Sequence, residues 1–171
     1  MTHSALKAGA EIFNNYGAKP NSELLLGYGF TLPANPDDTI VLKIGGTPSS
    51  GVQHEVGRDA RGAASVWDGI MDAMKAAEDE EVPEWQIILD SADTLRSMTE
   101  SLLARLPNVH VPTVMRTDVA ETISHYISGQ QEVLQDLVSY ANAHETGGVT
   151  MARREGVIIQ LDGEESDNQV R

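Results

Sequence analysis

Two tyrosines near the start of the chain, Tyr16 and Tyr28, each precede a glycine and stand twelve positions apart. With Phe13 and Phe30 they make up half of the eight aromatic residues in this 171-residue sequence. A glycine after an aromatic residue allows the backbone to approach a ligand closely or to turn with φ > 0. The spacing is compatible with a ligand site that both rings reach, and equally with a small core cluster packed by nearby leucines.

The other residue types that commonly carry chemistry are absent or scattered. The sequence has no cysteine, which excludes disulfides, thiolate zinc sites and cysteine nucleophiles. Its five histidines show no paired spacing, so we predict no metal site and assign them structural or surface roles. Neither G-x-S-x-G nor G-x-x-x-x-G-K-[ST] occurs, so the sequence gives no support for a serine hydrolase or a P-loop nucleotide site.

Charge and composition restrict the partners. Twelve basic and twenty-six acidic residues give a net charge of -14, which repels nucleic acids and anionic membranes, so neither is predicted to bind. The hydrophobic fraction of 40% is sufficient for a globular protein. No secretory signal or apolar segment of membrane-spanning length is evident, so we expect an intracellular protein, cytoplasmic or nuclear.

The hydrophobic pattern predicts an α+β fold in which helices dominate. TIVLKI (39–44) follows the turn-forming NPDD and predicts a strand, EIF (11–13) predicts a shorter one, and Asn21 is expected to cap a helix over 22–26. A stretch rich in Gly, Ser and Pro, from residue 45 to 62, is expected to be a long surface loop.

About three long helices are predicted between residues 62 and 145. The longest is expected over 118–144, and Gly129 inside it predicts a close contact with another helix or a slight bend. The last residues, 146–171, are polar and acidic towards the end, and we expect a mobile tail.

The stretch AGAEIFNNYGAKPNSELLLGYGF (8–30) combines a glycine and an acid, a Tyr-Gly pair, an asparagine, a second acid, an apolar pair and a final aromatic-Gly-Phe. It resembles the closing segment of the SET domain, in the subgroup of protein lysine methyltransferases that includes the Rubisco large-subunit methyltransferase. Pro20 stands where the family has serine, and its fixed φ suits a helix start. The resemblance is carried by Gly9, Glu11, Ile12, Tyr16, Gly17, Asn21, Glu23, Leu24, Tyr28, Gly29 and Phe30.

This resemblance implies an S-adenosylmethionine cofactor and a protein substrate with a lysine in a basic segment. Tyr16 occupies the position of the family's catalytic tyrosine. Tyr28, Gly29 and Phe30 occupy a stretch that lines the cofactor site and the neighbouring lysine channel in the family. A dry aromatic channel favours the neutral amine of lysine, whose ordinary pKa is about 10.4, and a tyrosine hydroxyl can orient its lone pair.

The resemblance also implies how the chain divides into parts. Residues 1–46 resemble the end of a SET core, 47–61 a linker and 62–145, more weakly, a helical substrate-binding domain, before the tail at 146–171. Because the upstream half of the core is not in the sequence, we expect the C-terminal portion of a methyltransferase, with an incomplete cofactor pocket and no activity alone. The alternative is a non-enzymatic acidic helical module that binds basic protein segments.

Overall fold

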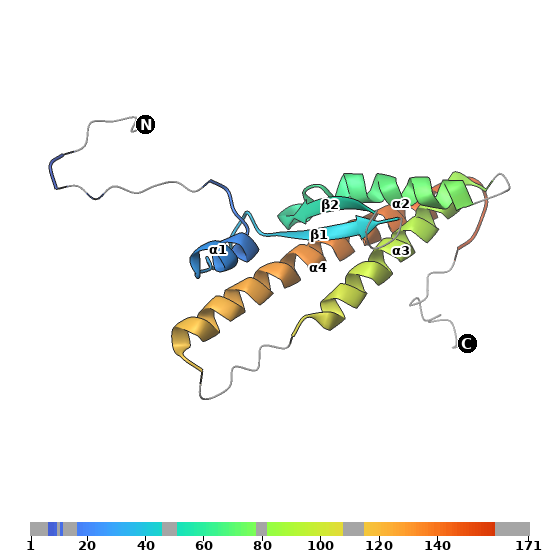
Figure 1. Cartoon of the computed structure of the whole chain (residues 1–171). Coiled ribbons are helices and arrows are strands. Elements are labelled where there is room, and N and C mark those ends of the chain that lie inside the picture. Colours follow the sequence, from blue (N-terminus) through green and yellow to red (C-terminus); the bar gives the residue numbers. More distant parts are fainter. Residues whose placement is uncertain are drawn as a thin grey trace.

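The computed structural model describes residues 7–9, 11, 17–45, 51–77, 82–107 and 115–159. A short helix and a two-stranded hairpin come first, and three longer helices follow them in the chain (Figure 1). The predicted α+β class with dominant helices is therefore confirmed. Of the strand predicted at 11–13, only Glu11 belongs to the described residues, so that prediction lies outside them.

The hairpin pairs β1 (Thr39–Ile44) with β2 (Val52–Gly57) in antiparallel register, with Val41 opposite Glu55. Strand β1 confirms the prediction from TIVLKI. The predicted long loop over 45–62 is wrong where β2 lies. The sequence of β2, VQHEVG, does not predict a strand, because it lacks the apolar alternation of a half-buried strand. Only its last two residues are buried.

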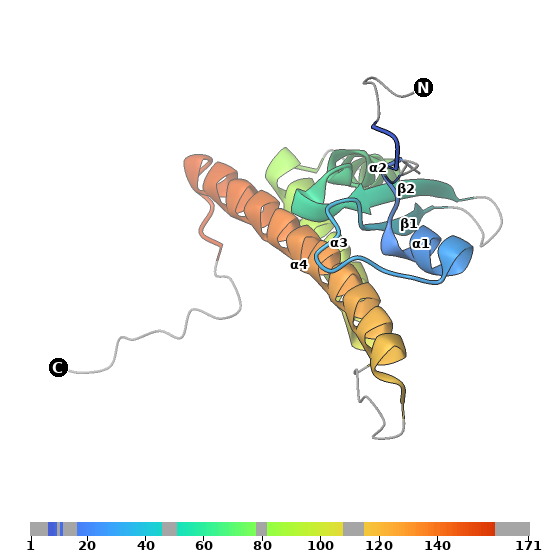
Figure 2. The same cartoon turned by 90° about the vertical axis from the view of Figure 1, so that its left-hand side faces the viewer.

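The three predicted long helices are present as α2 (Ala63–Ala77), α3 (Glu84–Arg105) and α4 (Thr117–Arg154). Helices α3 and α4 pack side by side, and α2 covers the hairpin and α3 (Figures 1 and 2). One core joins these helices to the inner face of the hairpin. Its most deeply buried members include Val56, Val66, Leu95, Val133 and Leu137.

Helix α4 extends beyond its predicted end at residue 144, to Arg154, so the first part of the expected tail is helical. Gly147 and Gly148 would each weaken an isolated helix by about 1 kcal/mol relative to alanine. Tertiary packing outweighs that penalty, because a Cβ at Gly148 would lie 3.0 Å from the side chains of Ile88 and Leu89 in α3. Glycine here permits the close approach of the two helices.

The short helix α1 (Asn21–Tyr28) packs against the N-terminal half of α4 (Figure 2). It confirms the helix predicted over 22–26 and extends it to Tyr28. Within the described ranges, no helix combines the length and the apolar character needed to cross a membrane.

Candidate functional site

The structure places three of the four predicted site residues in sequence at the end of α1. Tyr28 is the last residue of the helix, Gly29 is its C-cap and Phe30 follows. Gly29 has φ 76°, a left-handed conformation that glycine adopts without the steric strain of other residues. Tyr16, the predicted catalytic residue, lies outside the described residues.

The side chains of Tyr28 and Phe30 form an aromatic pair at the surface. Their ring centroids are 6.2 Å apart and their planes are tilted by 46°. They remain 46% and 41% exposed, so these two rings do not form a buried core cluster. Apart from Tyr28 and Phe30 themselves, no described atom lies within 4 Å of the position that a Cβ on Gly29 would take.

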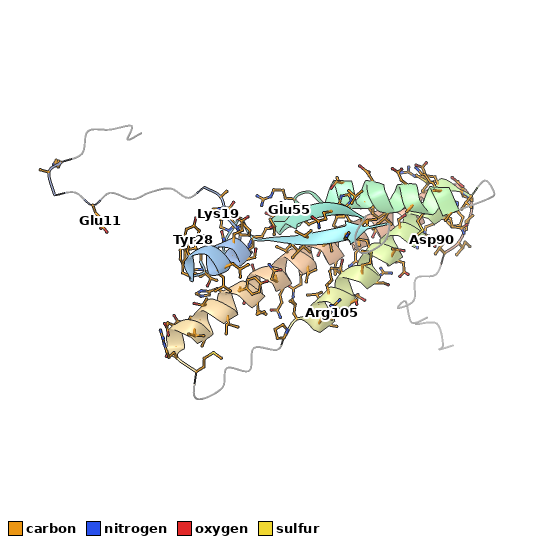
Figure 3. All side chains as sticks on the ribbon, in the orientation of Figure 1. Glu11, Lys19, Tyr28, Glu55, Asp90 and Arg105 are labelled. Atoms are coloured by element: carbon orange, nitrogen blue, oxygen red, sulfur yellow. The ribbon has the colours of Figure 1, made fainter. Side chains whose placement is uncertain are left out.

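An ion pair lies at the start of α1. Lys19 precedes the helix (Figure 3), and its ammonium contacts the Glu23 carboxylate in the first turn of α1 at 2.6 Å. The hydrogen bond from Lys19 to Glu23 raises the pKa of Lys19, and Tyr28 contributes in the same direction. The Lys19 charge is therefore paired with Glu23 beside the helix that carries Tyr28.

The segment that carries the pair is closed at its base by Asn21 and Leu32. The Asn21 Nδ2 group donates to the carbonyl of Leu32 at 2.9 Å, and the Leu32 N–H donates to Asn21 Oδ1 at 2.8 Å. Asn21 is fully buried. This reciprocal pair joins the first residue of α1 to the chain just beyond Phe30.

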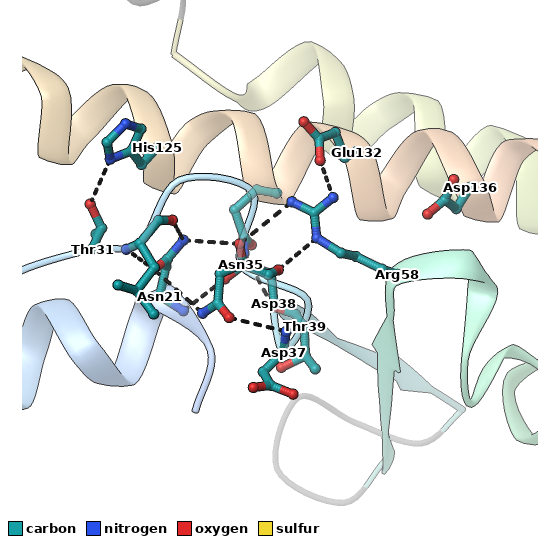
Figure 4. A network of polar contacts seen from close by, with 12 residues as sticks. Asn21, Thr31, Asn35, Asp37, Asp38, Thr39, Arg58, His125, Glu132 and Asp136 are labelled. Carbon is teal, nitrogen blue, oxygen red and sulfur yellow. Dashed lines mark hydrogen bonds and ion pairs between the residues drawn. The ribbon is translucent and has the colours of Figure 1, made fainter. Parts of the chain in front are cut away.

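Asp38, just before β1, holds Asn21 in place (Figure 4). Its Oδ1 accepts the backbone N–H of Asn21 at 2.7 Å, and its Oδ2 accepts the Asn21 Nδ2 group at 3.0 Å. The prediction that Asn21 caps the helix is wrong, since the N-cap is Pro20 and no side chain of that residue can accept. Asp38 instead satisfies the first N–H of α1 from seventeen residues away, where the helix dipole favours a negative charge.

Arg58, at the start of the 3-10 turn Arg58–Ala60, links this carboxylate to two other elements. Its Nε donates to the Asn35 carbonyl at 2.6 Å, Nη1 contacts the Glu132 carboxylate of α4, and Nη2 lies 3.9 Å from Asp38 Oδ2. Burial raises the pKa of Asp38, while the Asn21 hydrogen bonds and Arg58 oppose that rise. We call Asn21, Asn35, Asp38, Arg58 and Glu132 the Asp38 network.

Helix α4 supplies the surface on which this segment rests. The Thr31 hydroxyl donates to the Thr122 carbonyl at 3.2 Å and lies 3.4 Å from His125 Nδ1. Gly129 makes a close contact, but with the Asp38 carboxylate and not with another helix as predicted. The segment that carries the aromatic pair is thus anchored by α1, by the residues before β1 and by α4.

The sequence prediction missed the Asp38 network. The run NPDD (35–38) indicated only a turn, and Arg58 fell in the expected loop. Two signals were present in the sequence: an acidic residue directly before a buried strand, and a glycine within a strongly helical pattern. Neither signal reveals that Asp38 and Gly129 meet, because 91 residues separate them.

Comparison with known proteins supports a lysine methyltransferase resemblance in part. The chain is 60% identical over 44 residues to the ribosomal lysine N-methyltransferase set10 of Schizosaccharomyces pombe. Those residues make up 26% of this chain and 8% of the relative, so the chain spans only a small part of that protein's length. No protein family model matches the sequence.

The arrangement suits cation recognition at an aromatic surface. A cationic group over the face of a tyrosine or phenylalanine ring gains roughly 0.5–1 kcal/mol at exposed sites, and more where water is excluded. Among the described residues, no group of three or more His, Asp or Glu side chains has the geometry of a metal site.

Proposed function

We propose that this chain is the C-terminal portion of an S-adenosylmethionine-dependent protein-lysine N-methyltransferase of the SET family. The observation that carries the proposal is the 60% identity over 44 residues to a ribosomal lysine N-methyltransferase. In this proposal residues 1–46 complete a SET core of the Rubisco large-subunit methyltransferase subgroup. Residues 62–145 form the helical substrate-binding domain, after a connecting region at 47–61.

The aromatic pair supports a role for Tyr28 and Phe30 in lining the substrate channel. Their partly exposed rings suit one wall of a site for a sulfonium cofactor and a lysine side chain. When bound, S-adenosylmethionine supplies the methyl group. The rings exclude water from the substrate amine, and a drier environment lowers the amine's pKa towards the neutral form that can attack.

Tyr16 is the catalytic residue in this proposal. Its hydroxyl oxygen accepts an N–H of the substrate amine at the channel mouth, which leaves the amine lone pair directed towards the methyl group. The tyrosine forms no covalent intermediate. Its contribution is therefore to the transition state and not to the stability of the fold.

The substrate class follows from the relative and from charge. The relative acts on ribosomal lysine, as its name states. A net charge of -14 on this chain attracts basic, lysine-containing segments. We therefore propose a protein substrate with a lysine in a basic segment, in an intracellular compartment.

A second candidate function is a non-enzymatic acidic helical module. The observation that favours it is the main hydrophobic cluster of the described residues, whose buried members run from Ile40 to Ala141. The hairpin and the long helices thus share a core that does not use Tyr28 or Phe30. Such a module would bind basic segments equally well with and without the cofactor.

A chimaera tests the proposed function directly. In it, this chain replaces the corresponding part of the S. pombe enzyme, and the chimaera is incubated with labelled S-adenosylmethionine and ribosomes from cells that lack that enzyme. The methyltransferase proposal predicts labelled lysine in ribosomal protein. A folded chimaera that binds ribosomes but transfers no methyl group would instead favour the binding module.

A further inference from the structure

The aromatic pair sits on a segment whose position depends on one buried carboxylate. Between Asn21 and Leu32 the chain runs along α1, turns at Gly29 and returns past Phe30. The two hydrogen bonds between Asn21 and Leu32 join the two ends of this segment. The orientation of the Asn21 amide therefore decides where the aromatic rings stand.

Asp38 sets that orientation. Both of its oxygens accept N–H groups of Asn21, one from the backbone and one from the side chain. With Nδ2 directed at Asp38 and at the Leu32 carbonyl, Oδ1 is left to accept the Leu32 N–H and, at 3.5 Å, the Asn35 Nδ2 group. In the reversed amide, the Asn21 oxygen would face Asp38 Oδ2 and the Leu32 carbonyl, and the NH₂ group would face the Leu32 N–H. These hydrogen bonds would then be lost.

Only a carboxylate satisfies this geometry. An asparagine at position 38 has one acceptor oxygen and one NH₂ group, so either rotamer would direct an N–H at an N–H of Asn21. A buried donor left without an acceptor costs roughly 1–3 kcal/mol. Burying a charge is itself costly, and the nearby Arg58 guanidinium offsets part of that cost for Asp38.

We propose that Asp38 is a positioning residue, which fixes the Tyr28–Phe30 pair by holding Asn21 and, through it, Leu32. The functional value of this positioning rests on the proposed function, in which the two rings line the substrate channel. The positioning itself is a property of this chain. Hydrogen exchange measures this positioning without any methyl transfer, so an inactive chimaera and a failed positioning experiment are distinct results.

The test compares the 171-residue chain with its Asp38→Asn and Asn21→Ala variants by hydrogen exchange and NMR. The matched control is Asp37→Asn, which removes the same charge one residue earlier. Figure 4 shows the Asp37 carboxylate pointing away from Asn21, and within the described ranges no hydrogen bond or ion pair uses it. The amide of Leu137, in the centre of α4, reports the stability of the core.

Both network variants are expected to accelerate exchange of the Leu32 amide by about tenfold or more, while the Leu137 amide stays protected. The nuclear Overhauser contact between the Tyr28 and Phe30 rings should weaken in the same two variants. Asp37→Asn should leave all three signals unchanged. Unaltered Leu32 exchange in Asp38→Asn would overturn the proposal, as would equal acceleration at Leu32 and Leu137, which indicates general destabilisation.

Discussion

The carboxylate of Asp38 lies directly against the backbone of Gly129, in the middle of α4. A side-chain carbon at Gly129 would overlap Asp38 Oδ2 and would come within 2.8 Å of Asp38 Cγ. Glycine lowers the stability of an exposed helix interior, so its presence here is explained by the space that the buried carboxylate needs. The contact connects the longest helix to the residue that holds the aromatic segment.

Gly129→Ala is expected to lower the free energy of unfolding by about 1–3 kcal/mol, because the added methyl group forces the buried carboxylate to move. Gly147→Ala is the matched control in the same helix, since no described atom lies within 4 Å of its added Cβ. That control should raise stability by up to about 1 kcal/mol through helix propensity alone. Chemical denaturation followed by tryptophan fluorescence measures both, and two changes of the same sign would contradict the account.

Stability is expected to fall in mild acid because of His144. Its ring stacks on Trp67 of α2, with centroids 3.9 Å apart and planes within 20°, and burial lowers the pKa of His144 from 6.5. The unfolded chain therefore binds a proton that the folded chain does not. This contribution to stability is present above pH 6.5 and is lost as pH falls through the lower folded pKa.

His144→Phe isolates that effect, because phenylalanine stacks on Trp67 and cannot be protonated. Denaturant midpoints measured from about pH 7.5 to about pH 5 should fall less in the variant than in the wild type. The carboxylates that titrate at lower pH are common to both proteins, so their contribution cancels. Identical pH profiles would show that His144 has the same pKa in the folded and unfolded chain.

The helices and β1 could be predicted from the sequence because their signals are local. Apolar residues at helical spacing predicted α2, α3 and most of α4, and a β-branched run predicted β1. Strand β2 and the last turns of α4 could not be predicted in this way. Their stability comes from partners outside each element: β1 for the strand, and Ile88 and Leu89 of α3 for Gly148.

In the candidate site, too, only the local features could be predicted from the sequence. Tyr28, Gly29 and Phe30 were singled out by the resemblance to the SET family, and the structure places all three on one surface segment, while their role in a site stays a prediction. What holds that segment could not be found, because a local rule assigns helix capping to Asn21 itself. The carboxylate that accepts the first N–H of α1 belongs to Asp38. Asp38 is the last residue of NPDD (35–38), a run that by itself predicts only a turn.

Tyr28→Phe separates a channel role from a packing role. Its hydroxyl is expected to hold a water or crowd a methylated amine, so in the chimaera its loss should change how many methyl groups each lysine receives. The rate should fall by less than about tenfold. Because the ring is 46% exposed, the melting temperature should hardly change. Mass spectrometry of the methylated ribosomal protein counts the methyl groups, and an unchanged distribution would remove Tyr28 from the channel.

Tyr16→Phe in the same chimaera tests the central claim most directly. The variant loses one hydroxyl, so we expect kcat to fall by about a hundredfold or more while cofactor affinity and melting temperature stay nearly constant. Tyr126→Phe, the same change on α4, is the matched control and should retain full activity. Initial rates of labelled methyl transfer at saturating cofactor decide the question: a large loss confined to Tyr16→Phe is the predicted result, and undiminished transfer by a folded Tyr16→Phe chimaera would contradict the catalytic assignment.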